Sequence, residues 1–396
     1  MYKLKDIIQF SPQEKLRKGI IARKIAMEQL TPFNRFVQSN IFEEYKGGSK
    51  FRNGDTIMAR ITPCLENGKT AYISSLNLNE LAFGSTEFIV LRNIEGITDS
   101  KYIYYLIISP QVREIAIKSM VGSSGRQRVQ QSMLENYEIL LPSLDKQREI
   151  ATILSSLDDK IELNRRINDN LEQQAQALFK AWFVDFEPFK DGKFVDSELG
   201  RIPEGWKVME LGNVTKQITE RVGQRIDIKV LSPITTGELV LSEDYFTKQV
   251  FSESTAKYIV VKPMQFAYNP ARVNIGSMGM NTFPFNGCVS PVYVVFECEN
   301  EYQYFFDYLR KTKSFKEEVI SRAIGGVRQS LGYKDFALIK VIYPPKQVVA
   351  KFNEHYLSLL RLKGFNEEEN KKLSSLRDAL LPRLMSGELK IDDLNR

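Results

Sequence analysis

Two glycine-rich segments of the sequence each carry an Arg-Gln pair. One is Val121-Gly-Ser-Ser-Gly-Arg-Gln-Arg128, and the other runs from Gly325-Gly326 to Ser330. An arginine can donate two hydrogen bonds to guanine, and a glutamine amide can pair with adenine. Glycine and serine let backbone N–H groups approach a phosphate. We therefore predict DNA contacts at Gly122, Ser123, Ser124, Gly125, Arg126, Gln127, Arg128, Gly325, Gly326, Arg328, Gln329 and Ser330.

Six polar side chains close to predicted strands form a secondary set of candidate DNA contacts. They are Arg52, Arg60, Lys69, Lys262, Asn269 and Arg272. For both sets a structural role is the alternative: the loops pack on neighbouring strands, the arginines form ion pairs within the chain, and the secondary residues are solvated strand edges.

The sequence contains no convincing catalytic motif. An amino-methyltransferase needs Asn/Asp-Pro-Pro-aromatic, and the nearest strings, Tyr268-Asn-Pro-Ala271 and Tyr343-Pro-Pro-Lys346, do not fit. The single histidine, His355, falls on a predicted helix seam, where we expect a packed ring. We expect no catalytic residue and no cofactor bound by this chain.

Composition indicates a chain with two or three hydrophobic cores. The 396 residues are 43% hydrophobic, with no run of about 18 apolar residues and no charged-then-apolar leader, so we expect a cytoplasmic protein without a membrane partner. The three scattered cysteines suit reduced thiols and offer no metal-ligand spacing.

Charge is distributed unevenly along the chain. Residues 1–144 carry 19 basic and 14 acidic side chains, and residues 200–345 carry 18 and 15, whereas residues 145–199 carry 8 and 12. Two basic segments flanking an acidic one suit a polyanion bound at two places.

The elements that would hold these loops apart are two long helices. From Ile150 to Trp182, steps of four and three residues give ten seam positions, of which eight are apolar or aromatic. This heptad pattern predicts a helix of about 37 residues, long for a globular protein and typical of a coiled coil. The positions are Ile150, Leu154, Leu157, Ile161, Asn164, Asn168, Leu171, Ala175, Leu178 and Trp182.

A second helix is predicted from Gln347 to Leu384. Gly364 should weaken or kink it, and Pro382 and Gly387 should end it. Its seam would comprise Leu359, Leu362, Asn366, Leu373, Leu376, Leu380 and Leu384. The seam asparagines, Asn164, Asn168 and Asn366, either fix the register of the pair or face water at a gap.

The two halves of the chain repeat one plan. From Tyr102 to Pro142 a single offset of 202 aligns the first half with the second, and upstream the offset drifts to about 205 and then 210. Because each long helix follows its own globular segment, we predict an α+β fold. Two α/β domains would be separated by two long antiparallel coiled-coil helices with a pseudo-twofold internal repeat.

Local signals predict the elements within the first domain. Asn53-Gly54 indicates a hairpin, and the segment Ala82–Arg92 ends in a strand-like run. Asp99 or Ser100 should cap a helix to Ile108 that restarts after Pro110 and runs to about Met120. A last strand, Tyr137–Leu141, leads into the long helix.

Four sequence segments resemble the specificity subunit of Type I restriction–modification systems, in order and across the whole chain. Pro142-Ser-Leu-Asp-Lys-Gln-Arg-Glu-Ile150 opens the first helix, and Leu178-Phe-Lys-Ala-Trp-Phe-Val-Asp-Phe-Glu-Pro188 closes it. Gly200-Arg-Ile-Pro-Glu-Gly-Trp206 enters the second globular segment, and Leu376–Leu389 closes the chain.

The resemblance implies two target-recognition domains, residues 1–144 and 200–345, each reading half of a bipartite sequence in double-stranded DNA. It implies helical spacers, residues 145–199 and 346–396, that dock two methyltransferase subunits within a complex that also contains restriction subunits. S-adenosylmethionine, ATP and Mg would then be bound by those partners.

Apolar side chains crowd the C-terminal ends of both predicted helices, where they either close a core or form a partner patch. The resemblance favours partner binding for Phe179, Trp182, Phe183, Phe186, Leu380, Leu381, Leu384 and Met385. Two other classes stay open: an enzyme that methylates DNA by itself, and a coiled-coil adaptor without sequence-specific DNA binding.

Overall fold

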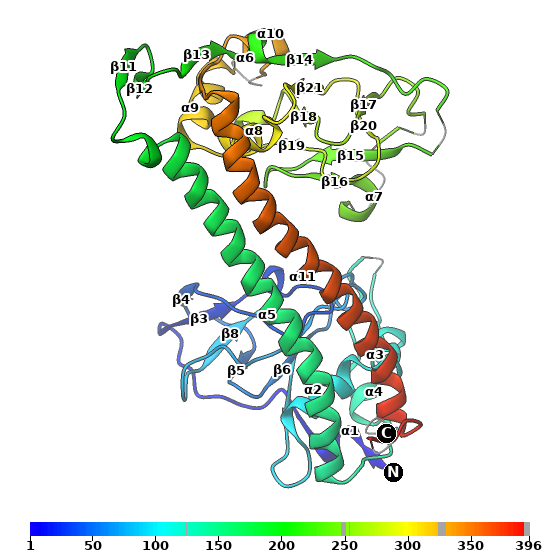
Figure 1. The fold of residues 1–396 in the computed structure, drawn as a ribbon. Coiled ribbons are helices and arrows are strands. Elements are labelled where there is room, and N and C mark those ends of the chain that lie inside the picture. The colour runs from blue at the N-terminus through cyan, green and yellow to red at the C-terminus, as the bar shows by residue number, and fades with distance from the viewer. Residues whose placement is uncertain (124, 226, 247–250, 253, 324–329, 392–396) are drawn as a thin grey trace. The chain divides into compact units, whose positions relative to one another are not determined.

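The computed structural model describes residues 1–396 except 124, 226, 247–250, 253, 324–329 and 392–396. The fold is α+β, and the chain forms two compact units (Figure 1). Unit 1 comprises Met1–Asn168 and Lys363–Arg396, and unit 2 comprises Asp169–Leu362. Each unit therefore includes part of both long helices. The domain bounds drawn from the sequence, which separate helices from globular segments, stay a prediction.

Unit 1 contains two four-stranded sheets. The first has the order β2-β9-β6-β7 and is antiparallel throughout. The second has the order β4-β3-β8-β5, in which only β3 and β8 are parallel. The strands are β2 (Ile8–Phe10), β3 (Ile21–Ile25), β4 (Phe42–Glu44), β5 (Lys50–Phe51), β6 (Thr56–Ala59), β7 (Thr70–Tyr72), β8 (Ala82–Gly84) and β9 (Phe88–Asn93).

Unit 2 contains the same two sheets. Their orders are β14-β21-β18-β19 and β16-β15-β20-β17, with β15 and β20 as the parallel pair. The strands are β14 (Thr215–Ile218), β15 (Lys229–Pro233), β16 (Leu239–Leu241), β17 (Ile259–Val261), β18 (Phe266–Tyr268), β19 (Met278–Met280), β20 (Gly287–Val289) and β21 (Val294–Cys298). Strand order and the position of the one parallel pair both match unit 1, so the predicted internal repeat is confirmed.

Helices cover these sheets in the same order in both units. Unit 1 has α2 (Ser100–Ile108), α3 (Pro110–Lys118) and α4 (Gln131–Glu135), and unit 2 has α8 (Gln303–Leu309), α9 (Lys313–Arg322) and α10 (Tyr333–Ala337). The predicted cap is confirmed, because the Asp99 side chain accepts a hydrogen bond from the Tyr102 backbone N–H at 2.9 Å. All residues from Tyr102 to Ile107 are buried, so α2 runs through the core.

The single offset of 202 is wrong for the first two helices. Ser109 caps α3 through the Val112 N–H, and Thr312 caps α9 through the Phe315 N–H, which is an offset of 203. The offset returns to 202 at α4 and α10. Unit 1 therefore has one more residue than unit 2 between these points, in the segment that contains the Arg-Gln loop.

Shorter elements complete both units. Unit 1 has β1 (Tyr2–Lys3), α1 (Leu4–Ile7), η1 (Met27–Gln29) and β10 (Glu138–Ile139). Unit 2 has η2 (Glu187–Phe189), β11 (Phe194–Ser197), β12 (Gly200–Pro203), β13 (Lys207–Glu210), α6 (Leu211–Val214), α7 (Ser242–Tyr245), η3 (Val273–Ile275) and β22 (Lys340–Tyr343). Antiparallel pairs β1–β10 and β13–β22 join the start of each domain to the strand that precedes its long helix.

The hairpin predicted at Asn53-Gly54 is wrong, although a turn is present there. β5 before the turn pairs with β8, and β6 after it pairs with β7 and β9 in the other sheet. The turn therefore passes the chain between sheets. Gly54 has φ +92°, a conformation that glycine adopts without strain.

Both long helices are confirmed, as α5 (Leu144–Phe183) and α11 (Lys346–Ser386). In unit 1, Asp158 of α5 pairs with Arg377 of α11, and Asn168 of α5 pairs with Asn366 of α11. The residue number increases along α5 while that of its partner decreases along α11, so the two helices run antiparallel. Of the ten seam positions predicted on α5, seven are buried and none is exposed.

The seam predicted on α11 is partly wrong. Leu362 and Leu376 are 55% and 48% exposed, whereas Arg377 is buried. Arg377 takes the inward position because it pairs with Asp158 on α5. α11 continues through Gly364 and through Pro382, which was predicted to end it, and stops at Ser386 before Gly387. Core packing of Leu381 and Leu384 offsets the one hydrogen bond that proline removes.

Asparagines occupy the middle of the helix pair in unit 1 and are bonded across it. Asn164 donates to Glu369 Oε2 at 2.6 Å and to Asn370 Oδ1 at 2.9 Å, and Asn366 donates to Asn168 Oδ1 at 2.8 Å. Asn164 is 0% exposed. These bonds support the role in register and contradict the alternative that the asparagines face water.

Candidate nucleic-acid interface

The first Arg-Gln loop is closed by backbone hydrogen bonds at its base. Val121 N–H donates to Arg128 O at 3.0 Å, and Arg128 N–H donates to Val121 O at 2.9 Å. Gly122 and Gly125 have φ values of +135° and +78°, which explains glycine at both positions. Ser123, Gly125 and Arg126 are exposed, Gln127 is half-buried, and Ser124 lies outside the described residues.

The loop is attached to the end of β6. Thr62 N–H donates to Gln127 O at 3.0 Å, and Val129 N–H donates to Arg60 O at 2.8 Å. Lys69 lies at the same strand end, since Ala59 N–H donates to Lys69 O at 3.0 Å. The structure thus brings two secondary candidates, Arg60 and Lys69, beside the primary loop.

The arginines of this loop differ in availability. Arg128 donates to the Glu87 carboxylate at 2.7 Å and 3.0 Å, and this hydrogen bonding holds the pKa of Glu87 below its ordinary value. Arg128 therefore fits the structural alternative, in which the arginine forms an ion pair within the chain. The Arg126 side chain is exposed and has no hydrogen-bond or ion-pair partner among the described residues. Arg126 therefore carries the guanidinium of this loop that the fold leaves unpaired.

Arg52 is placed apart from this cluster. It precedes β6, whereas Arg60 follows it, so the two arginines lie at opposite ends of the strand. Arg52 contacts Glu14 at 3.8 Å and is 56% exposed in its side chain. Lys69 Nζ donates to the Met27 carbonyl at 3.0 Å, so part of its donor capacity is already used.

In unit 2 only the residues that follow the second Arg-Gln pair can be placed. Gly325, Gly326, Arg328 and Gln329 lie outside the described residues, and Ser330 is described and exposed. Leu331 N–H donates to Pro270 O at 3.1 Å, so the loop returns to the fold next to Asn269 and Arg272.

The secondary candidates of unit 2 divide between the two ends of β18. Arg272 is exposed, and Asn269 accepts from the Ala271 N–H at 3.0 Å. Lys262 precedes β18 and is paired with Glu220 at 3.0 Å. As in unit 1, one candidate lies at the far end of the strand and two lie at the end that meets the loop.

The eight apolar side chains assigned to partner binding lie mostly inside the units. Phe179 and Phe183 belong to the core of unit 2, and Leu381 and Leu384 to the core of unit 1, each at 6% exposure or less. For these four the expectation of partner binding is replaced by core closure, because their surface is already covered. Trp182, Phe186, Leu380 and Met385 are half-buried.

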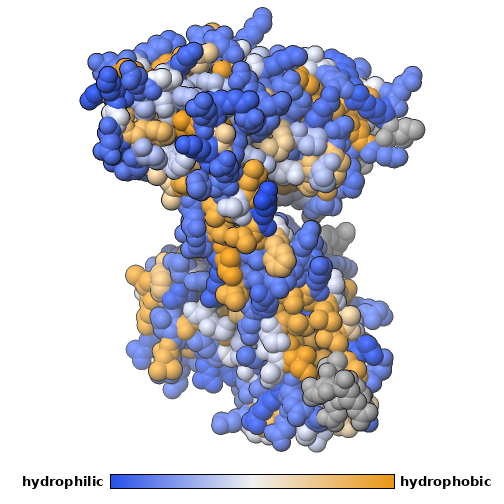
Figure 2. Space-filling model, in the orientation of Figure 1, coloured by the Kyte–Doolittle hydropathy of each residue, from blue (hydrophilic) through white to orange (hydrophobic). Residues whose placement is uncertain are grey.

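Exposed apolar side chains of the helical part of unit 1 were not singled out in the sequence. Leu163, Ile167 and Phe365 are 52%, 39% and 67% exposed. Hydrophobic surface is visible along the long helices in Figure 2. The signal available in the sequence was that these residues fall between the seam positions, where a helix pair exposes its side chains.

The described residues hold no metal-binding cluster of histidine, cysteine and acidic side chains, and their helices include none long and apolar enough to span a membrane. His355 is exposed rather than packed in the seam, with its ring 5.9 Å from that of Trp182.

Comparison with known proteins identifies the family. The family described as "Type I restriction modification DNA specificity domain" matches residues 1–173. The MjaIX specificity subunit of Methanocaldococcus jannaschii is 30% identical over 317 residues, covering 76% of this chain and 72% of the relative. The HindI specificity subunit of Haemophilus influenzae is 26% identical, covering 90% of this chain and 92% of the relative.

A solved structure supports the fold. The crystal structure of the S subunit of a Type-I restriction-modification system from M. genitalium aligns with a TM-score of 0.52 at 16% identity, covering 97% of this chain and 95% of that one. On the sequence evidence, this chain belongs to the specificity subunits of type I restriction–modification systems.

Proposed function

We propose that each globular part of this chain reads one half of a bipartite DNA sequence through the strand end that carries its Arg-Gln loop. The observation that carries this proposal is the same clustering in both units. Arg60 and Lys69 adjoin the loop of unit 1, and Asn269 and Arg272 adjoin the return of the loop in unit 2. Two diverged copies that keep polar side chains at the same strand end suit two different half-sites.

Arg126 is the leading base-contacting residue of unit 1. Its side chain is exposed and has no partner among the described residues, and its loop is closed at the base by backbone hydrogen bonds. Arg60 and Lys69, at the loop's base, suit phosphate contacts that position the domain.

The long helices have the second role in this proposal. They set the spacing between the half-sites and dock the methyltransferase subunits, with Leu163, Ile167 and Phe365 as candidate contacts. As a specificity subunit the chain is non-catalytic, and catalysis belongs to its partner subunits. S-adenosylmethionine would be bound by two methyltransferase subunits, and ATP and Mg by the restriction subunits.

The test compares Arg126→Ala and Arg328→Ala with the parent chain, each purified in complex with the methyltransferase subunits. We expect each variant to lose discrimination at one half-site by about 1–3 kcal/mol, with complex assembly unchanged. Methylation mapping across a random-sequence library measures the half-sites separately.

Lys118→Ala is the matched control, since Lys118 is an exposed cation that precedes the same loop and pairs with Glu114 on its own helix. This variant should weaken binding evenly across sequences, if at all. Unchanged half-site preference and unchanged salt dependence in both arginine variants would refute the assignment of the loops.

A further inference from the structure

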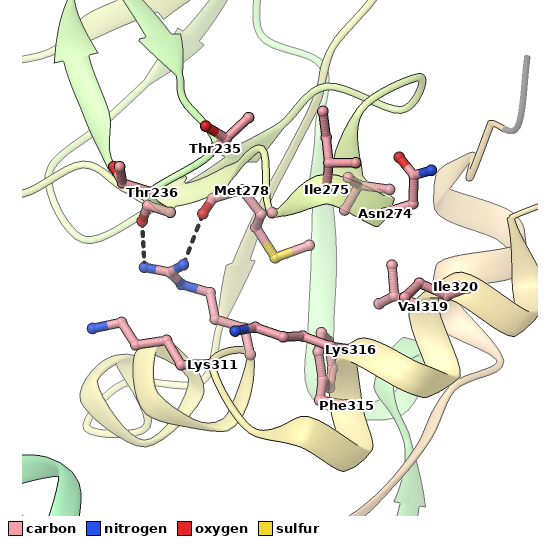
Figure 3. Close-up of a pocket in the computed structure, with 14 residues that line it drawn as sticks. Thr235, Thr236, Asn274, Ile275, Met278, Lys311, Phe315, Lys316, Val319 and Ile320 are labelled. Carbon is pink, nitrogen blue, oxygen red and sulfur yellow. Dashed lines mark hydrogen bonds between the residues drawn. The ribbon is translucent and has the colours of Figure 1, made fainter. Parts of the chain in front are cut away.

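A cavity of about 290 Å³ opens in unit 2 between the loop after β15, the η3 turn and α9 (Figure 3). Val273, Phe315 and Val319 line its apolar side, and Thr235 and Thr236 line its other side, where the Thr236 hydroxyl donates to Glu238 Oε2 at 3.0 Å. Its volume is close to the lower end of small-ligand sites, roughly 300 Å³. An apolar floor with a few polar groups suits a flat ring with polar edges.

Three cations line the cavity, and one of them is available to a ligand. Arg310 is held by Asp307 at 3.0 Å, Met278 O at 2.8 Å and Gly237 O at 2.7 Å. Lys311 is paired with Asp307 at 2.9 Å. The Lys316 side chain is exposed and has no hydrogen-bond or ion-pair partner in the part of the chain that the structure describes. Figure 3 shows it extending from α9 on the same side of the cavity as Phe315.

The residues that line this cavity have counterparts in unit 1. The helix caps Ser109 and Thr312 make Arg113 the counterpart of Lys316, and the turns before β7 and β19 make Gly68 the counterpart of Gly276. Both glycines have positive φ, +74° and +94°.

In unit 1 the chain fills this place with its own ring. Phe33 lies so close to Gly68 that a Cβ on the glycine would be 2.6 Å from the ring. The Arg113 guanidinium lies 5.2 Å from the centroid of the Phe33 ring, within the range of a cation–π interaction. Unit 1 thus contains an aromatic ring between the turn and the cation. In unit 2 the Thr235 carbonyl oxygen lies against Gly276, 2.7 Å from where a Cβ would be, and the cavity lies beside these two residues.

We propose that the cavity of unit 2 accepts the base of an unpaired nucleotide, with the Lys316 ammonium over its face. The Thr235 hydroxyl can bond to the base edge, the Thr236 hydroxyl can accept a hydrogen bond from it, and Lys316 can also meet the phosphate. Arg272 directly precedes η3, whose residues line the cavity, and Leu331 N–H donates to Pro270 O two residues before Arg272. This inference rests on the proposed function, because it makes the cavity part of the DNA surface of unit 2.

The first experiment measures binding of deoxynucleoside 5′-monophosphates and of inorganic phosphate to the full chain in complex with the methyltransferase subunits, by isothermal titration calorimetry. We expect one nucleotide per chain and a loss of roughly 2- to 30-fold in affinity for Lys316→Ala, with Lys316→Arg retaining it. Lys313→Ala is the matched control, because Lys313 lies on the same helix, is 89% exposed and pairs with Glu317. The proposal would be overturned if inorganic phosphate bound as tightly as the nucleotides, or if no nucleotide bound.

The converse variant uses unit 1. Phe33→Gly removes the ring from beneath Arg113, and glycine tolerates the positive φ of +56° at this position. The number of nucleotides bound should rise from one to two. A folded variant that still binds one would contradict the equivalence of the two sites.

The second experiment places 2-aminopurine at successive positions of a duplex that carries the mapped target. One position in the half-site read by unit 2 should become several-fold brighter on binding, and Lys316→Ala should abolish the increase. If sequence-specific binding is intact but no position brightens, the cavity proposal fails and the proposed function stands. If no sequence dependence is found for the parent complex, the proposed function itself fails.

Discussion

At the residue scale, unit 1 is held together by a buried ion pair between its two long helices. Arg377 Nη1 and Asp158 Oδ1 are 2.7 Å apart, with side chains 6% and 4% exposed. Tyr105 donates to the other Asp158 oxygen at 2.6 Å, so the globular part shares in the same network. Burial opposes the charge of Arg377, yet Asp158 and Asp378 raise its pKa above the ordinary value. A buried pair of this kind is costly to break from one side.

We predict that Arg377→Met destabilises unit 1 by about 3–5 kcal/mol, because Asp158 is left buried without its cation. Hydrogen exchange of unit 1 peptides measures the effect. Both tryptophans, Trp182 and Trp206, belong to unit 2, so tryptophan fluorescence reports on unit 2 as an internal control.

The double variant Asp158→Leu/Arg377→Met removes both charges and should recover most of the lost protection. A single variant as stable as the parent would show that the pair contributes nothing to the fold.

A second residue-scale prediction concerns Asp307 beside the cavity of unit 2. Burial alone would raise the pKa of Asp307, but Arg310 and Lys311 hold its pKa below the ordinary value. A carboxylate with a lowered folded pKa stabilises the fold above its unfolded pKa, about 3.9, and that contribution is lost as pH falls through the folded pKa.

Urea unfolding followed by tryptophan fluorescence should therefore show unit 2 weakening as pH drops below about 4. Asp307→Asn should be less stable at pH 7 and lose less on acidification. An identical pH profile for parent and variant would mean that other carboxylates account for the acid sensitivity.

At the element scale, the asparagine seam of unit 1 trades stability for a defined register. Asn168 and Asn366 bond to each other across the helix pair, and polar residues at such positions select one alignment at a cost in stability. We predict that Asn168→Leu/Asn366→Leu raises the resistance of the helix pair to denaturant and permits more than one register.

Spin labels at exposed positions 156 and 372, with Cys64 replaced by serine, measure the register as a distance distribution. The parent should give one narrow distance and the double variant a broader distribution. A narrow distribution in both would assign the register to the ion pair of Asp158 and Arg377.

At the scale of the whole molecule, the proposed spacer role gives a prediction in base pairs. Seven residues lengthen a helix by about 10 Å, which corresponds to about three base pairs of duplex. Inserting one heptad into both α5 and α11 should lengthen the unspecified segment between the half-sites by about that number, as read by methylation mapping.

A heptad added to α5 alone should abolish recognition, since the seams no longer match. A four-residue insertion that leaves both the methylated sequence and its spacer unchanged would remove the helices from this role.

Local chemistry in the sequence was sufficient for much of the fold. Asp99 as a helix cap, the seam of α5 and the loop between Val121 and Arg128 all depend on residues close together in the chain. The internal repeat could also be predicted from the sequence, because the same sequence motifs occur in the same order in both halves of the chain. The candidate DNA contacts were chosen from the same order of signals and stay a prediction.

Contacts between distant residues decided the rest, and their partners cannot be identified from neighbouring positions. The turn at Gly54 joins two sheets because of strand partners more than 20 residues away. Arg128 is neutralised by Glu87, whereas Arg126 is left exposed in the same loop. Phe33 packs against Gly68 in unit 1, whereas in unit 2 a cavity lies beside Gly276. In each case the sequence determined which side chains were present, and tertiary packing determined which of them remained available.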